Sequence, residues 1–499
     1  MAATRIDVKG CFVFLLVCGL VFSSEAAVWL SGSKSMDTLG NSGVYGTKGV
    51  PSSSNIPGAR YLSASWVDGD GNLWLFGGFF TMFRTGKLYN DLWKYDVLSG
   101  QWTWVSGANT PANSGVYGTK GVASVAYCPC ARDGSVTWVD SSGDFWLFGG
   151  NNRNDLWRFN PATGAWAWMS GSIDFGQPGV YGTKGVPDVS NVPGGRGEAI
   201  SWTGPDGSLW LFGGVLRSSE LFGTNYYMSD LWRFDPSTGL WTWVSGLSVT
   251  NQPGTYGIKG IAGAANVPGA RSGSVSWTDD EGNFWLFGGY GYDSTGAMGY
   301  LNDLWKYDIS MGLWVWMSGS NLRNQSGFYG VHGQSNPLNM PAARSGSISW
   351  VDGRGEFWLL GGDHDPYPYW ANDLWRYSPS SGLWTWMRGP NLANQTGIYG
   401  TKGVANSANM PGARTRSTAW ASGNHLYLFG GYGCDATGVG GFLNDLWKFT
   451  CDGDPGDLNG DCTVDFDDLD RMAQDWLADY TFIDFKAVSK SWFMERYPD

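Results

Sequence analysis

A run of oxygen-bearing side chains near the C-terminal end has the spacing of a calcium-binding loop. The stretch from Asp457 to Asp468 places them at loop positions 1, 3, 5, 9 and 12, and a backbone carbonyl falls at position 7. Ca²⁺ takes six to eight oxygen ligands, and a twelve-residue loop with this spacing supplies them. The predicted ligands are Asp457, Asn459, Asp461, Thr463 through its carbonyl, Asp465 and Asp468.

An amphipathic helix is predicted directly after this loop, because apolar residues from Phe466 to Trp476 fall on one face. Loop and helix together resemble the first half of a type I dockerin, the module that docks bacterial enzymes and binding proteins onto cohesins. The resemblance implies a small α-helical, EF-hand-like module at residues 452–499, with calcium as cofactor and a cohesin-like partner. A second calcium loop is missing, so a calcium-stiffened C-terminal tag is the alternative.

Two irregular segments carry side chains that could hold a ligand by stacking. Exposed aromatic rings on a rigid scaffold suit contacts with sugar rings or with a protein partner. Packing of the same rings onto the scaffold is the alternative. The predicted ligand-binding residues are Trp370, Tyr367, Tyr369, His364, Tyr226 and Tyr227.

The same segments carry carboxylates that could hydrolyse a glycosidic bond. This chemistry needs two carboxyl groups placed across the bond. Asp363, Asp365 and Glu220 lie in suitable segments, but sequence alone does not fix the distances between them. A metal site at His364 between the two aspartates is a further reading, and a solvated acidic loop is the one we favour.

These residues must be positioned by a sixfold repeat that dominates the chain. An aromatic-Leu-Phe/Leu-Gly-Gly element recurs with its first glycines at 77, 149, 213, 288, 361 and 430. In each copy, period-two runs separated by Gly and Asp turns predict four antiparallel strands. One copy has strands at 271–277, 284–287, 302–307 and 313–317.

The repeat resembles the kelch family, in which a Gly-Gly doublet precedes an aromatic residue and a Trp seven positions later. Five copies have this pair, as in Tyr307 and Trp314. The resemblance covers residues 27–451 and implies a six-bladed β-propeller, with one four-stranded sheet per blade. These copies are longer than the ~50 residues of a kelch repeat because each has an inserted segment.

The sixth copy lacks a fourth strand, and the amino-terminal end supplies a matching one. The run from Val28 to Gly32 is similar to the fourth strand of the second copy, which begins at Ala167. An open ring would leave an unpaired sheet edge. We therefore expect the amino-terminal strand, with Trp29, to close the ring beside Trp447.

Alternate loops of such a meander lie on opposite faces, so the long connections share one face. The inserts, of the type Gly43–Gly49, lie on that face, and we favour a structural role for them over ligand binding. Each copy also has an arginine at the start of its first strand and an aspartate at the start of its third. Buried Arg–Asp pairs are the favoured interpretation, and a ring of arginines that holds an anion is the alternative.

A copper-radical oxidase is a further possibility, because a kelch-like oxidase family similar to galactose oxidase binds copper with His and Tyr ligands. The chain has only three histidines, His332, His364 and His425, and Tyr367, Tyr369 and Cys434 would have to join them. No spacing supports such a site.

Composition and charge exclude several classes of protein. The 499 residues include 76 Gly and 31 Trp, with 16% aromatic and only 15% charged residues, which excludes a disordered chain and a coiled coil. A net charge of -12 without a basic patch speaks against a nucleic-acid partner.

The amino-terminal end predicts export. Arg5 and Lys9 precede the apolar run 11–22, and small residues follow it, which predicts a signal peptide at 1–26 and no membrane span after cleavage. In an oxidising compartment, Cys451 and Cys462 form a plausible disulfide. Cys128 and Cys130 could form a local disulfide, a metal clip or two separate thiols.

The sequence therefore predicts a secreted, non-enzymatic propeller that binds a polysaccharide or an extracellular protein. Its tail would attach it to a partner or to a surface assembly. The alternative is a carbohydrate-active enzyme, either an O-glycosyl hydrolase or a copper-radical oxidase.

Overall fold

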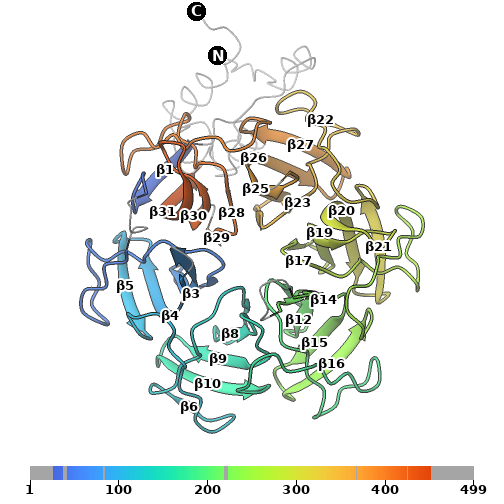
Figure 1. Ribbon diagram of the computed structural model, residues 1–499, viewed down its shortest axis with the longest axis horizontal. Coiled ribbons are helices and arrows are strands. Elements are labelled where there is room, and N and C mark those ends of the chain that lie inside the picture. Colours follow the sequence, from blue (N-terminus) through green and yellow to red (C-terminus); the bar gives the residue numbers. More distant parts are fainter. Residues whose placement is uncertain are drawn as a thin grey trace, which may run out of the picture. The chain divides into compact units, whose positions relative to one another are not determined.

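The computed structural model describes residues 26–36, 42–82, 85–218, 223–366, 368–423 and 425–450. The segment from Ala26 to Thr450 is one compact unit, a β-propeller of six blades (Figure 1). The predicted all-β fold and the number of blades are confirmed. The described residues form no helix, and so include none that could cross a membrane.

Each blade is a meander of four antiparallel strands, and the first strands contact one another around the central axis. The first strands of blades 1 to 6 are β2 (Ala64–Val67), β7 (Val136–Val139), β11 (Ile200–Thr203), β18 (Val275–Thr278), β24 (Ile348–Val351) and β29 (Thr418–Ser422). The second strands are β3 (Leu73–Met82), β8 (Phe145–Phe148), β12 (Leu209–Phe212), β19 (Phe284–Tyr292), β25 (Phe357–His364) and β30 (His425–Cys434).

The third and fourth strands complete the blades toward the outside. The third strands are β4 (Thr85–Asp96), β9 (Leu156–Asn160), β15 (Leu231–Asp235), β20 (Met298–Asp308), β26 (Tyr369–Ser378) and β31 (Gly440–Thr450). The fourth strands are β5 (Gln101–Ser106), β10 (Ala165–Ser170), β16 (Leu240–Ser245), β21 (Leu313–Ser318), β27 (Leu383–Arg388) and β1 (Ala26–Ser31).

Seven shorter strands extend these sheets or stand beside them. Three of them precede the first strand of their blade in sequence and pair with its second strand. Two others form a hairpin in blade 3, and the last two pair with a fourth strand. In that order they are β17 (Arg271–Ser272), β23 (Arg344–Ser345), β28 (Arg414–Thr415), β13 (Val215–Leu216), β14 (Tyr226–Tyr227), β6 (Ala123–Ser124) and β22 (Ser335–Asn336).

The amino-terminal strand closes the ring. Strand β1 pairs antiparallel with β31, and Trp29 lies opposite Trp447 in the register. The outer edge of β31 is therefore paired rather than exposed. The predicted closure of the sixth blade is confirmed.

Tryptophans of the first strands join neighbouring blades. Trp66 of blade 1 stacks on Phe145 of blade 2 with ring centroids 5.3 Å apart, and its indole N–H donates to the Trp146 carbonyl at 3.0 Å. Four further first-strand tryptophans donate to a carbonyl of the next blade in the same way. Trp350 differs, because it stacks on Trp358 of its own blade.

The inserts cover the outer edges of the blades. Gly49 N–H donates to the Trp104 carbonyl at 2.8 Å, and the equivalent glycine reaches the fourth strand in all six blades. Lys48 lies over the Trp104 ring at 4.4 Å, and four other inserts repeat this contact. An open fourth strand would be a template for aggregation. These contacts support the structural role of the inserts.

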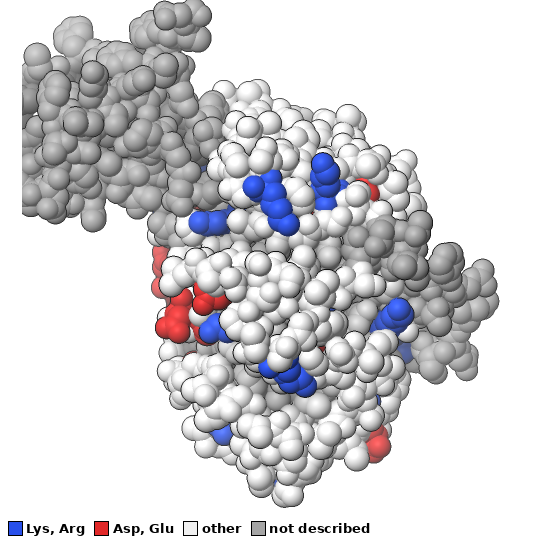
Figure 2. All heavy atoms as spheres, turned by 90° about the vertical axis from the view of Figure 1, so that its left-hand side faces the viewer, with Lys and Arg blue, Asp and Glu red and all other residues white. Residues whose placement is uncertain are grey.

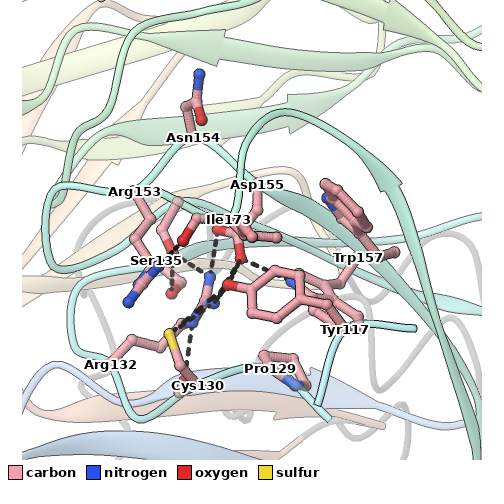
Figure 3. A network of polar contacts seen from close by, with 12 residues as sticks. Tyr117, Pro129, Cys130, Arg132, Ser135, Arg153, Asn154, Asp155, Trp157 and Ile173 are labelled. Carbon is pink, nitrogen blue, oxygen red and sulfur yellow. Dashed lines mark hydrogen bonds and ion pairs between the residues drawn. The ribbon is translucent and has the colours of Figure 1, made fainter. Parts of the chain in front are cut away.

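A buried ion pair anchors each insert to its blade, as Figure 3 shows for blade 2. Arg132 donates to both carboxylate oxygens of Asp155 at 2.7 Å, and the Tyr117 hydroxyl and the Trp157 indole donate to the same carboxylate. All six blades repeat the pair, and no arginine side chain in it is more than 3% exposed. The alternative of an anion-binding arginine ring is therefore wrong.

Two cysteines accompany this network in blade 2 as free thiols. The Cys130 sulfur accepts from Arg132 at 3.1 Å, whereas the Cys128 sulfur lies 3.7 Å from the Asn90 amide. Of the three possibilities for this pair, the structure has two separate thiols.

Charged side chains are sparse on the outside of the propeller. Figure 2 shows scattered Lys, Arg, Asp and Glu among broad uncharged areas on the side in view. This agrees with the charged fraction of 15%. Positive charges are not gathered into one patch on that side.

Candidate functional site

A cavity of about 720 Å³ opens at the mouth of the central channel, on the face of the hairpins between second and third strands. Every blade contributes to it through the residue that directly follows the Gly-Gly doublet. In chain order, these residues are Phe79, Asn151, Val215, Tyr290, Asp363 and Tyr432. An invariant doublet is thus followed by a position that differs in almost every blade.

The doublet fixes where this variable residue lies. Gly288 has φ +63°, and a Cβ there would lie 2.8 Å from the Arg344 carbonyl oxygen of the next blade. The first glycine of every doublet meets the next blade's arginine carbonyl in this way. Only glycine tolerates both the conformation and the close approach. The following residue is therefore held at the channel mouth in all six blades.

The third strands, and in blade 3 the short strand β14, supply a second set of lining residues, three positions before the repeat aspartate. Cross-strand pairs join the two sets, as between Tyr290 and Tyr300 or Asp363 and Trp370. The members that line the cavity are Leu88, Tyr227, Tyr300, Trp370 and Phe442. Trp370, which sequence analysis placed in an irregular segment, therefore occupies a repeat position.

Two aromatic walls face each other across the cavity. One runs through blades 5, 6 and 1, where ring centroids are 5.3 Å apart for Trp370 and Tyr432, and 4.9 Å for Tyr432 and Phe442. Tyr61 and Phe79 continue this wall. The other wall consists of Tyr227, Tyr290 and Tyr300 of blades 3 and 4.

A closed ring of backbone hydrogen bonds surrounds the axis at the starts of the first strands. One residue per blade donates its N–H to the carbonyl of the preceding blade, with N···O distances of 2.7–3.0 Å. All six residues have positive φ. They are Leu62, Gly134, Glu198, Gly273, Gly346 and Arg416.

Two members of this ring form an ion pair across the axis. Glu198 of blade 3 accepts from Arg416 Nε of the opposite blade 6 at 3.0 Å. A Cβ on Gly346 would lie 2.9 Å from Arg416 Cγ, and one on Gly273 would lie 3.5 Å from the Glu198 carboxylate. Gly346 therefore leaves room for the Arg416 side chain, whereas the distance at Gly273 is an ordinary contact. A non-glycine residue in the left-handed region is strained, and such strain gathers at functional sites.

Further charged groups extend the pair into a network that lines the cavity. Arg217 contacts Glu198 and lies 3.5 Å from Asp133. Asp363 accepts from Arg416 at 3.0 Å, from Thr415 Oγ1 at 2.7 Å and from the Tyr300 hydroxyl at 3.0 Å. Three carboxylates thus meet two guanidinium groups.

The network gives its carboxyl groups different proton affinities. Burial raises the pKa of Glu198, but Arg217 and Arg416 outweigh burial and hold that pKa below its usual value. Burial dominates at Asp133, where Glu198 adds to it and Arg217 only partly offsets it, so the pKa of Asp133 is raised. Burial also raises the pKa of Tyr61 to about 12. At neutral pH Glu198 is therefore firmly ionised, whereas Asp133 holds a proton more readily.

The predicted ligand-binding residues are only partly brought together. Trp370 and Tyr227 line the cavity, and Trp370 is 8% exposed behind Tyr432. Tyr226 and Tyr369 are 44% and 41% exposed and do not line it. His364 contacts Tyr369 and, like Asp365, lines a smaller pocket. Tyr367 and Glu220 lie outside the described residues.

The copper ligands considered for an oxidase do not converge. His332 packs edge-on against Trp386 of the outer strand. His425 and Cys434 stand at opposite ends of β30, about 30 Å apart for a ten-residue strand. Among the described residues, no three His, Cys, Asp or Glu side chains are arranged to hold a metal ion.

Of the five charged residues of the cavity, sequence analysis named only Asp363 and missed the other four. Asp133, Glu198 and Arg416 follow the repeat arginine by one or two positions, where the other blades have mostly Gly or Ser. Arg217 follows a doublet by three positions. The signal that could have identified Asp133, Glu198 and Arg416 is that charged side chains stand where the other copies of the repeat have mostly Gly or Ser.

No family model matches the chain, and no curated protein matches it. The kelch and dockerin resemblances therefore rest on the motifs alone. The six predicted calcium ligands, Cys451 and Cys462 lie outside the described residues, as does the predicted signal peptide apart from Ala26.

Proposed function

We propose that the protein is a secreted, non-enzymatic carbohydrate-binding propeller, with the central cavity as its binding site. The observation that carries the proposal is the pair of aromatic walls in the same cavity as a network of charged and polar groups. Sugar rings have apolar faces that stack on aromatic rings, and hydroxyl groups that need hydrogen-bonding partners. A volume of about 720 Å³ lies within the usual range of ligand pockets, about 300–1,000 Å³.

The polar groups of the cavity suit hydroxyl recognition. The side chains of Arg217 and Arg416 are 37% and 21% exposed, while carboxylates bind part of each guanidinium group. Because carboxylates hold each guanidinium group in place, its remaining N–H groups are fixed hydrogen-bond donors. Asn151, Asn225 and Ser272 add neutral donors and acceptors. A concave site of this kind favours a sugar over the flat surface of a protein partner.

The tail then serves attachment. Export by the amino-terminal segment brings the protein to the outside of the cell, and calcium bound by Asp457–Asp468 orders the module at 452–499 for a cohesin-like partner. Since the described residues form no helix, a gain of helical circular dichroism in the full chain on adding calcium would report on this module. An unchanged spectrum would contradict it.

The test compares cavity aromatics with exposed ones. The full chain is screened against soluble oligosaccharides, and the affinity for each bound sugar is measured by calorimetry. We expect Tyr290→Ala and Phe79→Ala, on opposite walls, each to weaken binding about fivefold, because stacking is worth about 1 kcal/mol per ring and a tenfold change needs about 1.4 kcal/mol.

Tyr226→Ala and Tyr369→Ala are the matched controls, because both rings lie outside the cavity. We expect them to bind as the wild type does, with thermal unfolding showing that all four variants fold. Loss of binding in the controls with full binding in the cavity variants would contradict the proposal.

A glycoside hydrolase is the second candidate, favoured by the three carboxylates in the same cavity. Against it, Glu198 and Asp363 are each bound by arginine, so neither is free to attack or to accept a proton. Release of reducing ends from a bound oligosaccharide, lost in Asp133→Asn, would establish the enzyme instead.

A further inference from the structure

We propose that the cavity selects a sugar that carries a free amino group, with Asp133 as the residue that pairs with its ammonium. This inference rests on the proposed function and names its ligand class. It follows from the charges of the network, from the partners of each carboxylate and from the aromatic walls.

With all of its groups ionised, the network carries one net negative charge. Asp133, Glu198 and Asp363 are opposed only by Arg217 and Arg416 among the charged residues that line the cavity. A buried charge without a partner is costly. A ligand with one positive charge would complete the set, whereas an acidic sugar would add to the excess.

Asp133 is the carboxylate that lacks partners. Its side chain is 6% exposed, and its one charged contact is Arg217 Nη1 at 3.5 Å, which is long for a hydrogen bond. Among the described residues, no other side chain donates to it. Glu198 has two guanidinium partners, and Asp363 has three donors. Asp133 therefore has free acceptor capacity in the cavity.

The surroundings of Asp133 also suit a cation. The faces of aromatic rings attract cations, and Tyr61 of the aromatic wall lines the same cavity as Asp133. Burial weakens water's competition for the same carboxylate. An ammonium on a sugar ring would gain both contacts, and an acetylated nitrogen, which is neutral, would gain neither.

The experiment titrates the full chain with three tetrasaccharides of equal linkage, made of β-1,4-linked glucosamine, N-acetylglucosamine or glucose. We expect the glucosamine tetramer to bind at least tenfold more tightly than the other two. In Asp133→Asn, its affinity falls to the level of the glucose tetramer, while binding of the glucose tetramer is unchanged. Asp280→Asn, on the exposed turn at the other end of blade 4, keeps the wild-type preference.

The outcomes separate this inference from the proposed function. If wild-type protein binds a neutral sugar through Tyr290 and Phe79 but does not prefer the amine, the inference is overturned and the proposed function stands. A preference that survives in Asp133→Asn also overturns it. If no sugar of any kind binds, both fail.

Discussion

Single residues of the repeat divide into two groups with different tasks. The arginine and aspartate of each blade, such as Arg132 and Asp155, are buried and bound to each other, so they hold the blade together. Their neighbours in sequence, such as Asp133 and Glu198, line the cavity. Evolution of a ligand site can therefore change the second group while the first keeps the fold.

Two of the three buried carboxyl groups of the cavity, Glu198 and Asp133, should affect stability in opposite ways. The pKa of Glu198 is lower in the folded chain, so its contribution is present above its ordinary pKa of about 4.3 and is lost as the pH falls through the folded value. The pKa of Asp133 is raised, so its contribution to stability is full below its ordinary pKa of about 3.9 and is lost as the pH rises from there through the raised folded value.

We therefore expect Glu198→Gln to lower the melting temperature at neutral pH and Asp133→Asn to raise it. Both differences should shrink at about pH 3, where the carboxyl groups are largely protonated in the unfolded chain. Thermal unfolding at both pH values checks this. If Asp133→Asn instead lowered the melting temperature at neutral pH, the Asp133 carboxylate would stabilise the folded chain, and the prediction would be wrong.

At the scale of the elements, the Gly-Gly doublet joins each blade to the next. Its first glycine packs against the arginine carbonyl of the next blade. In blade 1, the N–H of the second glycine also donates a hydrogen bond to this Arg132 carbonyl at 2.9 Å. The doublet is therefore a contact between blades as well as a turn.

This contact predicts unequal effects of two glycine substitutions. Gly288 and Gly164 have φ of +63° and +70°, but a Cβ at Gly288 would meet two backbone oxygens within 2.9 Å, while one at Gly164 would meet nothing within 4 Å. We expect Gly164→Ala to cost about 1–2 kcal/mol through backbone strain alone, and Gly288→Ala to cost clearly more. Urea denaturation measures both, and equal costs would refute the packing role.

The strands, the turns and the number of blades could be predicted from the sequence, because they follow from local patterns. Trp29 could be matched to Trp447 because one strand was missing and one was spare. The path of the inserts could not be predicted, because hydrogen bonds such as that from Gly49 to Trp104 join segments that no sequence periodicity relates. Trp370 was misjudged because its equivalents, Tyr300 and Phe442, are different residue types.

The propeller of Ala26–Thr450 is a ring closed at three levels: by β1 on β31, by the six hydrogen bonds around the axis, and by the ion pair of Glu198 and Arg416 across it. Residues of all six blades line the cavity. Its shape therefore depends on closure, and no single blade could form it.

Removal of β1 tests this dependence. A chain that begins at Gly32 leaves β31 with an unpaired outer edge, whereas a chain that begins at Ala26 keeps the pairing. We expect the shorter chain to unfold at a lower temperature and to associate through the open edge. Light scattering with size-exclusion chromatography compares the two, and equal stability as monomers would count against closure by β1.

The most direct test of the binding site is a crystal structure of the full chain grown with the glucosamine tetramer. We predict a sugar ring between the wall of Tyr432 and the wall of Tyr290, with its nitrogen beside Asp133. A sugar bound at Tyr226 or Tyr369 on the outside, with the cavity empty, would contradict the account.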